Sequence, residues 1–151
     1  MPPAITDPFR ITYRSGNEHN PGDPTGLVVL AIAGDGAVTV SQRARGGAVQ
    51  NQWAGTTDRG VIERVTEHLA VAKFPLVPDH RIVAGSTLRT IEITTGETTQ
   101  TCNPTSWDAV DAMPGYREAY RLLDSITTEV TAGSLKMLVD PEPGLARPSA
   151  C

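Results

Sequence analysis

The stretch LVVLAIAGDGAVTV, residues 27–40, constrains the fold more than any other part of the chain. Residues 27–33 form an almost continuous apolar run, which is typical of a central strand with both faces covered. Asp35 and Gly36 then tolerate the positive φ angles that short hairpin loops require. Because apolar and polar residues alternate again after the turn, the stretch predicts an antiparallel hairpin.

Three further stretches predict strands. In FRITYRSG, residues 9–16, Phe9, Ile11 and Tyr13 alternate with polar residues, as in a strand with one face in water. AVQNQWAG, residues 48–55, is polar enough to be the edge of a sheet, where a partner can add a strand. LRTIEITTGETTQTCNP, residues 88–104, predicts a second hairpin.

The spacing of apolar residues changes to three and four in two segments, which predicts two main helices. The first stripe lies in residues 56–77 and comprises Val61, Ile62, Val65, Leu69 and Ala72. The second lies in residues 115–130 and comprises Tyr116, Ala119, Tyr120, Leu123, Ile126 and Val130. Between them, Thr105 can cap a short helix that ends at Pro114. Two main helices can cover one face of the sheet.

We therefore expect an α+β fold: an antiparallel sheet of five to six strands with two main helices packed on one face, a two-layer sandwich. A chain of 151 residues favours one domain. We place that domain at residues 9–132. Residues 1–8 are expected to be a flexible N-terminus, and residues 133–151, rich in proline and glycine, a mobile C-terminal tail.

Composition argues against several classes of function. The net charge is −4 and no cluster of Lys and Arg occurs, so a nucleic-acid partner is not expected. The longest apolar stretch, GLVVLAIAG, is far shorter than a membrane span. The start, MPPAITDPFR, lacks the pattern of a secretory signal, and Cys102 and Cys151 do not resemble a disulfide framework. These features predict a cytoplasmic location.

Signatures of catalysis are missing from the sequence. The three histidines have no metal-ligand spacing, and neither G-x-S-x-G nor a phosphate-binding glycine pattern occurs. Pairing of Cys102 with His80 is the one nucleophile arrangement that stays open. We assign no catalytic residue, metal ligand or cofactor, and the sequence favours a protein that is not an enzyme.

The stretch SGNEHNPGDPTG, residues 15–26, is far longer than the two residues that suffice to join antiparallel strands. Its Gly, Pro and Asn content suits turns. We predict that it contacts a partner protein through Asn17, Glu18, His19 and Asp23. Trp53 is a further candidate for that interface, although core packing also suits it. The alternative is a small enzyme, or a metal- or small-molecule-binding protein, that uses Glu18, His19 and Asp23.

The order of these patterns resembles the emfourin-like small bacterial proteins, which include a protein inhibitor of thermolysin-like metallopeptidases. The resemblance covers residues 9–130 and rests on four features: the R-S-G at residues 14–16, the helix end AKFPLV, the hairpin LRTIEITTGE and the closing P…Y…LLDSI helix. This chain departs from the pattern in its longer NEHNPGDP loop. The resemblance implies a small, non-enzymatic binding protein with an inhibitor or immunity-like role. No inhibitory residue is carried over.

Overall fold

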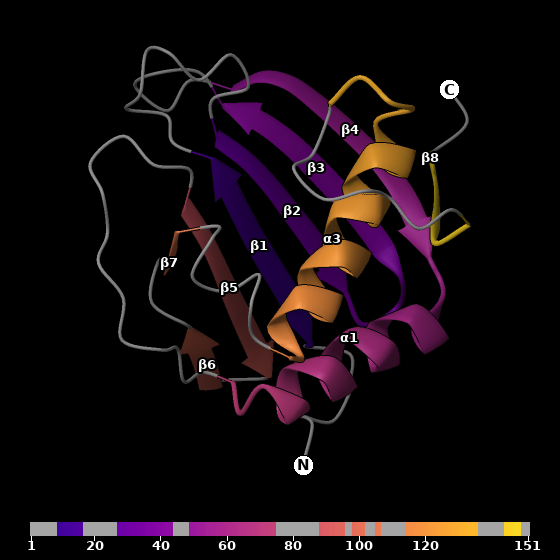
Figure 1. The fold of residues 1–151 in the computed structure, drawn as a ribbon. Helices are drawn as coiled ribbons and strands as arrows, with labels where there is room; N and C mark the ends of the chain where they lie inside the picture. Colours follow the sequence, from indigo (N-terminus) through magenta and orange to yellow (C-terminus); the bar gives the residue numbers. More distant parts are fainter. Residues whose placement is uncertain are drawn as a thin grey trace.

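The computed structural model describes residues 9–16, 27–43, 49–74, 88–95, 98–101, 105–106, 114–135 and 144–148. All pairings between its strands are antiparallel, and the order across the sheet is β6-β5-β1-β2-β3-β4-β8, with β7 also pairing β5. The helices α1 and α3 lie on one face (Figure 1). The α+β two-layer fold that the sequence predicts is confirmed.

The strands and helices have the following bounds. The strands are β1 Arg10–Gly16, β2 Leu27–Ala33, β3 Ala37–Arg43, β4 Val49–Thr57, β5 Leu88–Thr95, β6 Thr98–Thr101, β7 Thr105–Ser106 and β8 Ala146–Pro148. The helices are α1 Arg59–Val71 and α3 Tyr116–Val130. None of the helices in the described ranges is long and apolar enough to cross a membrane.

The turn at Asp35-Gly36 forms the hairpin that the sequence predicts. Gly36 has a φ of 94°, and its amide donates to the carbonyl oxygen of Ala33 at 3.0 Å. The Asp35 carboxylate accepts from the amide of Ala37 at 2.9 Å, which fixes the start of β3. This turn sets the register of β2 against β3, so that Leu30 lies opposite Val40.

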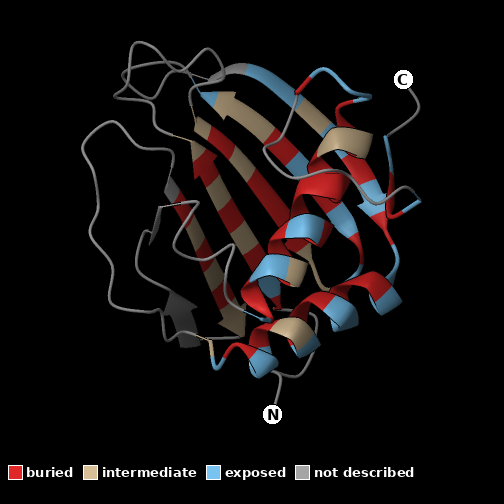
Figure 2. Ribbon diagram, viewed as in Figure 1, coloured by how far each residue is buried: buried red, intermediate tan, exposed pale blue. Residues whose placement is uncertain are grey.

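One face of the sheet carries the core. In register, Ile93, Ile11, Ile32 and Val38 make one buried row across the strands. The next row runs from Ile91 through Tyr13, Leu30 and Val40 to Trp53, which is half-buried. Figure 2 shows these rows as buried bands that cross the strands beneath the helices. We call this the inner face.

The opposite, outer face of the sheet is not covered by any described helix. For this reason β2 is less buried than the sequence predicts. Val28, Leu30 and Ile32 are fully buried, whereas Val29 and Ala33 on the outer face are only partly so. A continuous apolar run signals burial on both faces only where a second layer is present.

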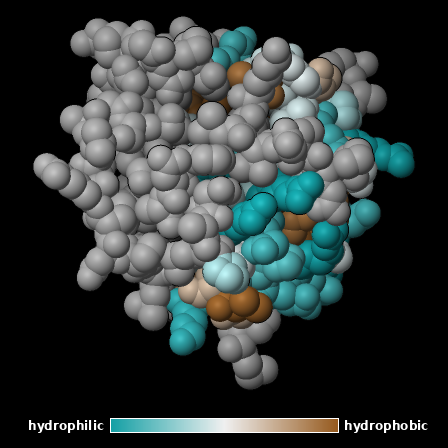
Figure 3. Space-filling view, in the orientation of Figure 1, coloured by the Kyte–Doolittle hydropathy of each residue, from teal (hydrophilic) through white to brown (hydrophobic). Residues whose placement is uncertain are grey.

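Both helices turn their predicted apolar stripes toward the core. Every residue of the two stripes given above is buried. Gly115, which has a φ of 93°, caps the start of α3, and its amide donates to the Glu118 carboxylate at 2.7 Å. The described exterior in view is mostly hydrophilic (Figure 3), and Val71 on α1 is the large hydrophobic side chain exposed among the described residues.

Two short strands lie where the sequence predicts other structures. Thr105 and Ser106 form β7 against β5 instead of opening a helix; the rest of that expected helix lies outside the described residues, apart from Pro114. Residues 146–148, assigned from the sequence to a mobile tail, form β8 against the end of β4. Both pairings join residues remote in sequence, which local patterns do not reveal.

The β8 segment is attached to the domain by polar contacts as well as by strand pairing. The Glu129 carboxylate accepts from the amides of Leu145 at 3.1 Å and Ala146 at 2.8 Å. The hydroxyl of Thr57 donates to the carbonyl oxygen of Leu145 at 2.6 Å. Since Leu145 is also buried, this part of the C-terminal segment belongs to the folded domain.

Gly55 permits the close approach of β8, which generates a first prediction. A Cβ at this position would overlap the carbonyl oxygen of Arg147 and lie 2.9 Å from a methyl group of Val130. We expect Gly55→Ala to lower the free energy of unfolding by about 1–3 kcal/mol. Urea unfolding measures this. In the control Gly60→Ala, a Cβ meets nothing within 4 Å, and stability should be unchanged or slightly higher. Equal losses in both variants would contradict the docked position of β8.

Candidate functional site

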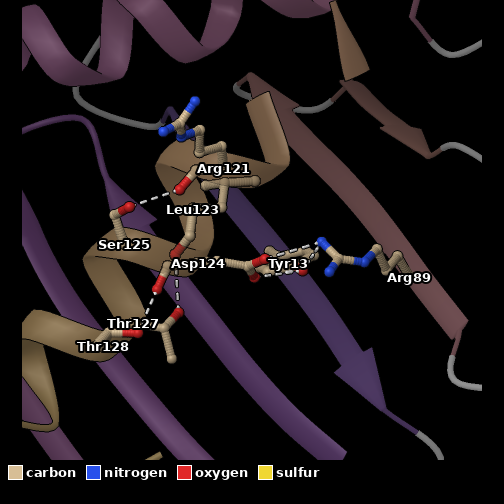
Figure 4. A network of polar contacts seen from close by, with 8 residues as sticks. All are labelled: Tyr13, Arg89, Arg121, Leu123, Asp124, Ser125, Thr127 and Thr128. Atoms are coloured by element: carbon tan, nitrogen blue, oxygen red, sulfur yellow. Dashed lines mark hydrogen bonds and ion pairs between the residues drawn. The ribbon is translucent and has the colours of Figure 1, made fainter. Parts of the chain in front are cut away.

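A buried polar network joins β1, β5 and α3 (Figure 4). The hydroxyl of Tyr13 donates to Oδ1 of Asp124 at 2.8 Å. Arg89 donates through one Nη to the Tyr13 hydroxyl oxygen at 2.7 Å and to Oδ2 of Asp124 at 3.1 Å. The side chains of Arg89 and Asp124 are 1% and 0% exposed, so this ion pair is removed from water. It is the feature of the described residues that most resembles a functional site.

The strand register explains how these groups meet. Tyr13 lies opposite Ile91, and Ser15 lies opposite Arg89, so Tyr13 and Arg89 both project from the inner face. Asp124 is on the buried side of α3, next to Leu123 in sequence. The Cζ atom of Arg89 lies 4.9 Å from the ring centroid of Tyr120, and the rings of Tyr13 and Tyr120 are 5.6 Å apart. Aromatic faces therefore surround part of the guanidinium.

Burial dominates the electrostatics of the network. Burial raises the pKa of Asp124 from 3.8 to about 6, although the charge of Arg89 and the hydrogen bonds from Tyr13 and Arg89 oppose the rise. Burial, followed by the charge of Asp124, raises the pKa of Tyr13 well above 10. Burial acts to lower the pKa of Arg89, but Tyr13 and Asp124 outweigh it and the pKa rises. At neutral pH the network thus holds a charged pair and a neutral phenol.

This arrangement suits a structural role. Each of the three groups uses the other two as hydrogen-bond partners, and all are inside the core. A charged pair with these bonds holds one relative position of helix and strands, because any shift would leave charges buried without compensation. We therefore regard the network as the support of a site.

The end of the sheet above this network is where several connections meet. Gly16 lies opposite both Leu27 and Leu88, Leu27 lies opposite Arg43, and Arg43 lies opposite Val49. The segments 17–26, 44–48 and 75–87 therefore join the sheet side by side at this end, which we call the loop end. Arg89 lies one residue from it and Tyr13 three. Connections fixed on a rigid scaffold are common places for recognition.

The sequence-predicted site residues fall in two places. Asn17, Glu18, His19 and Asp23 lie outside the described residues, as do His80 and Cys102. Trp53 lies on the inner face of β4, opposite Val40, and packs half-buried against the core. This position agrees with the core role that the sequence left open for it. No group of three or more His, Cys, Asp or Glu that could hold a metal occurs among the residues described.

The network itself was not among the predicted site residues, although the sequence contains a signal for it. Arg89, Ile91 and Ile93 are spaced two residues apart, so Arg89 falls on the apolar face of its strand. Asp124 lies between Leu123 and Ile126 on the apolar side of its helix. A buried charge requires a partner of opposite charge, so these two positions could have been paired. What the sequence did not supply was the register that brings them within reach.

The chain matches no protein-family model and no curated protein.

Removal of one charge from the network provides a second prediction. Unlike protonation, which keeps both oxygens in place, Asp124→Leu removes the oxygens that accept from Tyr13 and Arg89 and leaves the charge of Arg89 buried without a partner carboxyl group. We expect the free energy of unfolding to fall by about 3–5 kcal/mol. In the double variant Arg89→Met/Asp124→Leu, apolar groups replace both charges, and most of the stability should return. Urea unfolding of both proteins decides this. A double variant as unstable as Asp124→Leu would show that the charges themselves are required.

The raised pKa of Asp124 gives a third prediction, on pH. A carboxyl group with a higher pKa in the folded chain binds protons more readily when folded, so its contribution to stability grows as pH falls toward 3.8. Between pH 7 and pH 5 we expect the wild type to gain stability relative to the Arg89→Met/Asp124→Leu variant, by up to about 1.4 kcal/mol per pH unit. Urea unfolding at both pH values measures this. A relative loss would mean that the Arg89 charge outweighs burial.

Proposed function

We propose that this chain is a non-catalytic protein-binding domain that recognises its partner through the loop end of the sheet. The observation that carries the proposal is the convergence of segments 17–26, 44–48 and 75–87 on one end of the sheet. Antiparallel sheets commonly bind partners through connections gathered in this way.

The Tyr13–Arg89–Asp124 network supports the proposal because it lies beneath that end. It joins β1 and β5, the two strands on which segments 17–26 and 75–87 are fixed, to the long helix α3. A scaffold that does not shift lowers the entropy cost of presenting a binding surface. The expected contact residues are Asn17, Glu18, His19 and Asp23, and Trp53 is expected to hold β4 against the core at the side of this surface.

The kind of partner follows from the resemblance noted in the sequence. An inhibitor or immunity-like protein binds one target protein and needs a rigid frame with a protruding connection. We infer a bacterial protein as the target. The chemistry of segment 17–26, with one Glu, one Asp, one His and two Asn, favours a polar contact surface on that protein.

Position-dependent cross-linking tests the proposal and is the fourth prediction. A photo-crosslinking amino acid is placed at position 19 in cells that express the chain. As a matched control, it is placed at Ala37, which is exposed at the opposite end of the sheet. We expect a defined cross-linked protein from position 19, none from position 37, and loss of the product when residues 17–24 are replaced by an Asn-Gly turn.

Two outcomes would overturn the proposal. One is equal cross-linking from both positions, or none from position 19 in the folded protein. The other is a stoichiometric metal in the purified chain that is lost with Glu18, His19 and Asp23, since that result favours the metal-binding alternative. Thermal unfolding of each variant establishes that the domain remains folded.

A further inference from the structure

The outer face of β2 carries apolar side chains that neither described helix covers. These side chains belong to Leu27, Val29, Ala31 and Ala33, and all of them except Ala31 are partly exposed. Because β2 lies between β1 and β3, its main-chain groups are paired on both sides. A central strand with apolar side chains on both faces is typical of a sheet with a layer on each face. The apolar row of β2 is therefore a place where a second layer can pack.

Arginines flank this apolar row on both sides. On β1, Arg10 lies opposite Ala33 and Arg14 lies opposite Val29. On β3, Arg43 lies opposite the first residue of β2. Since residues directly opposite each other in antiparallel strands project from the same face, all three arginines are on the outer face. Arg10 and Arg43 are exposed, and Arg14 is partly exposed.

The charge of this face differs in sign from that of the whole chain. The net charge of the chain is −4, whereas the outward-facing residues of β1, β2 and β3 include the three arginines and no carboxylate. Glu92, opposite Thr12, is the outward carboxylate on the neighbouring strand β5. A local positive charge on an acidic chain attracts an acidic partner to that place. Charge complementarity therefore favours Asp and Glu side chains on whatever packs against this face.

The dimensions of the face suit an α-helix that lies along β2. The strands β1 and β3 are about 10 Å apart, and an α-helix with its side chains is about 10–12 Å wide. Arg10 and Arg14 are about 13 Å apart along β1, which corresponds to somewhat more than two turns of a helix. A helix in this position places its apolar side over the row of β2 and its two flanks over the arginines.

The same residues do not favour a nucleic acid. The outward-facing residues of β1, β2 and β3 include no aromatic side chain on which a base could stack. The arginines are separated by the apolar row, which offers a phosphate chain no partner. An amphipathic helix uses both the apolar row and the charges.

We propose that the outer face of β1, β2 and β3 binds an amphipathic helix of a partner protein, with its apolar side on β2 and its acidic flanks on Arg10, Arg14 and Arg43. The complex has a helix layer on each face of the sheet. This surface does not use the segments that join at the loop end, so the inference goes beyond the proposed function and does not depend on it. Since ion pairs at an exposed site are weak and screened, the affinity falls as salt is added.

Binding of two synthetic helical peptides to the full chain provides the first part of the test, which is the fifth prediction. The peptides share one apolar stripe of Leu and Ala, and their flanks carry Glu in one and Lys in the other. By fluorescence anisotropy we expect the Glu-flanked peptide to bind at least about ten-fold more tightly, with a smaller difference at high salt. The net charge of −4 alone gives the opposite preference. Equal binding of both peptides, or no binding of the Glu-flanked peptide at millimolar concentration, contradicts the proposal.

Charge reversal provides the second part and places the binding site. In Arg10→Glu/Arg14→Glu we expect the preference to reverse, so that the Lys-flanked peptide binds more tightly. Arg64→Glu/Arg121→Glu makes the same change in net charge at exposed positions on α1 and α3 and should keep the wild-type preference. Thermal unfolding establishes that each variant is folded. If the Glu variant does not fold, Arg10→Gln/Arg14→Gln removes the charges only and should abolish the preference.

Two results of the charge-reversal experiment would overturn the inference. One is a preference that the β1 variant leaves unchanged, and the other is a reversal that both double variants share. A duplex DNA that binds the wild type more tightly than the Glu-flanked peptide would also exclude a helix as the natural occupant of this face.

Discussion

The position of α3 on the sheet depends on the ion pair between Arg89 and Asp124, with the Tyr13 hydroxyl between them. Apolar packing alone tolerates small sliding movements of a helix on a sheet, because many positions bury similar area. Two buried charges do not tolerate such movement, since each loses its partner within a small displacement. The network thus selects one arrangement of β1, β5 and α3, even though burial raises the pKa of Asp124 and so lowers its contribution to stability at neutral pH.

That constraint bears directly on the part of the chain that we propose binds a partner. The strands β1 and β5 carry segments 17–26 and 75–87 at the loop end, and both strands belong to the network. A second region, formed by β4 and β8, is held separately by Glu129 on α3 and by Gly55, which lets the backbone of Arg147 approach. The helix α3 therefore positions both the loop end and the opposite side of the sheet.

Most local elements could be predicted from the sequence, because each follows from contacts between near neighbours. The Asp35-Gly36 turn, the alternation of Phe9, Ile11 and Tyr13, and the apolar stripes of both helices agree with the structure. The burial of a strand face that depends on a second layer over the sheet could not be predicted from the sequence in this way. The residues 27–33 form an apolar run, yet Val29 and Ala33 lie on a face that no described helix covers. Likewise, the sequence of residues 144–148 does not indicate a strand, since its pairing partner is far away in β4. The predicted contact residues between positions 17 and 23 remain predictions.

The sequence by itself determined the class of the fold, the faces of the strands and helices, and the two charged residues on apolar faces, Arg89 and Asp124. The spacing of apolar residues and the residue types that form turns are local properties of the sequence, so they are already present in the unfolded chain. Only the tertiary structure decided that these two charges meet each other, that Tyr13 lies between them, and that β8 covers one part of β4 and not the rest. These outcomes depend on strand order and register, which arise when segments distant in sequence pack together.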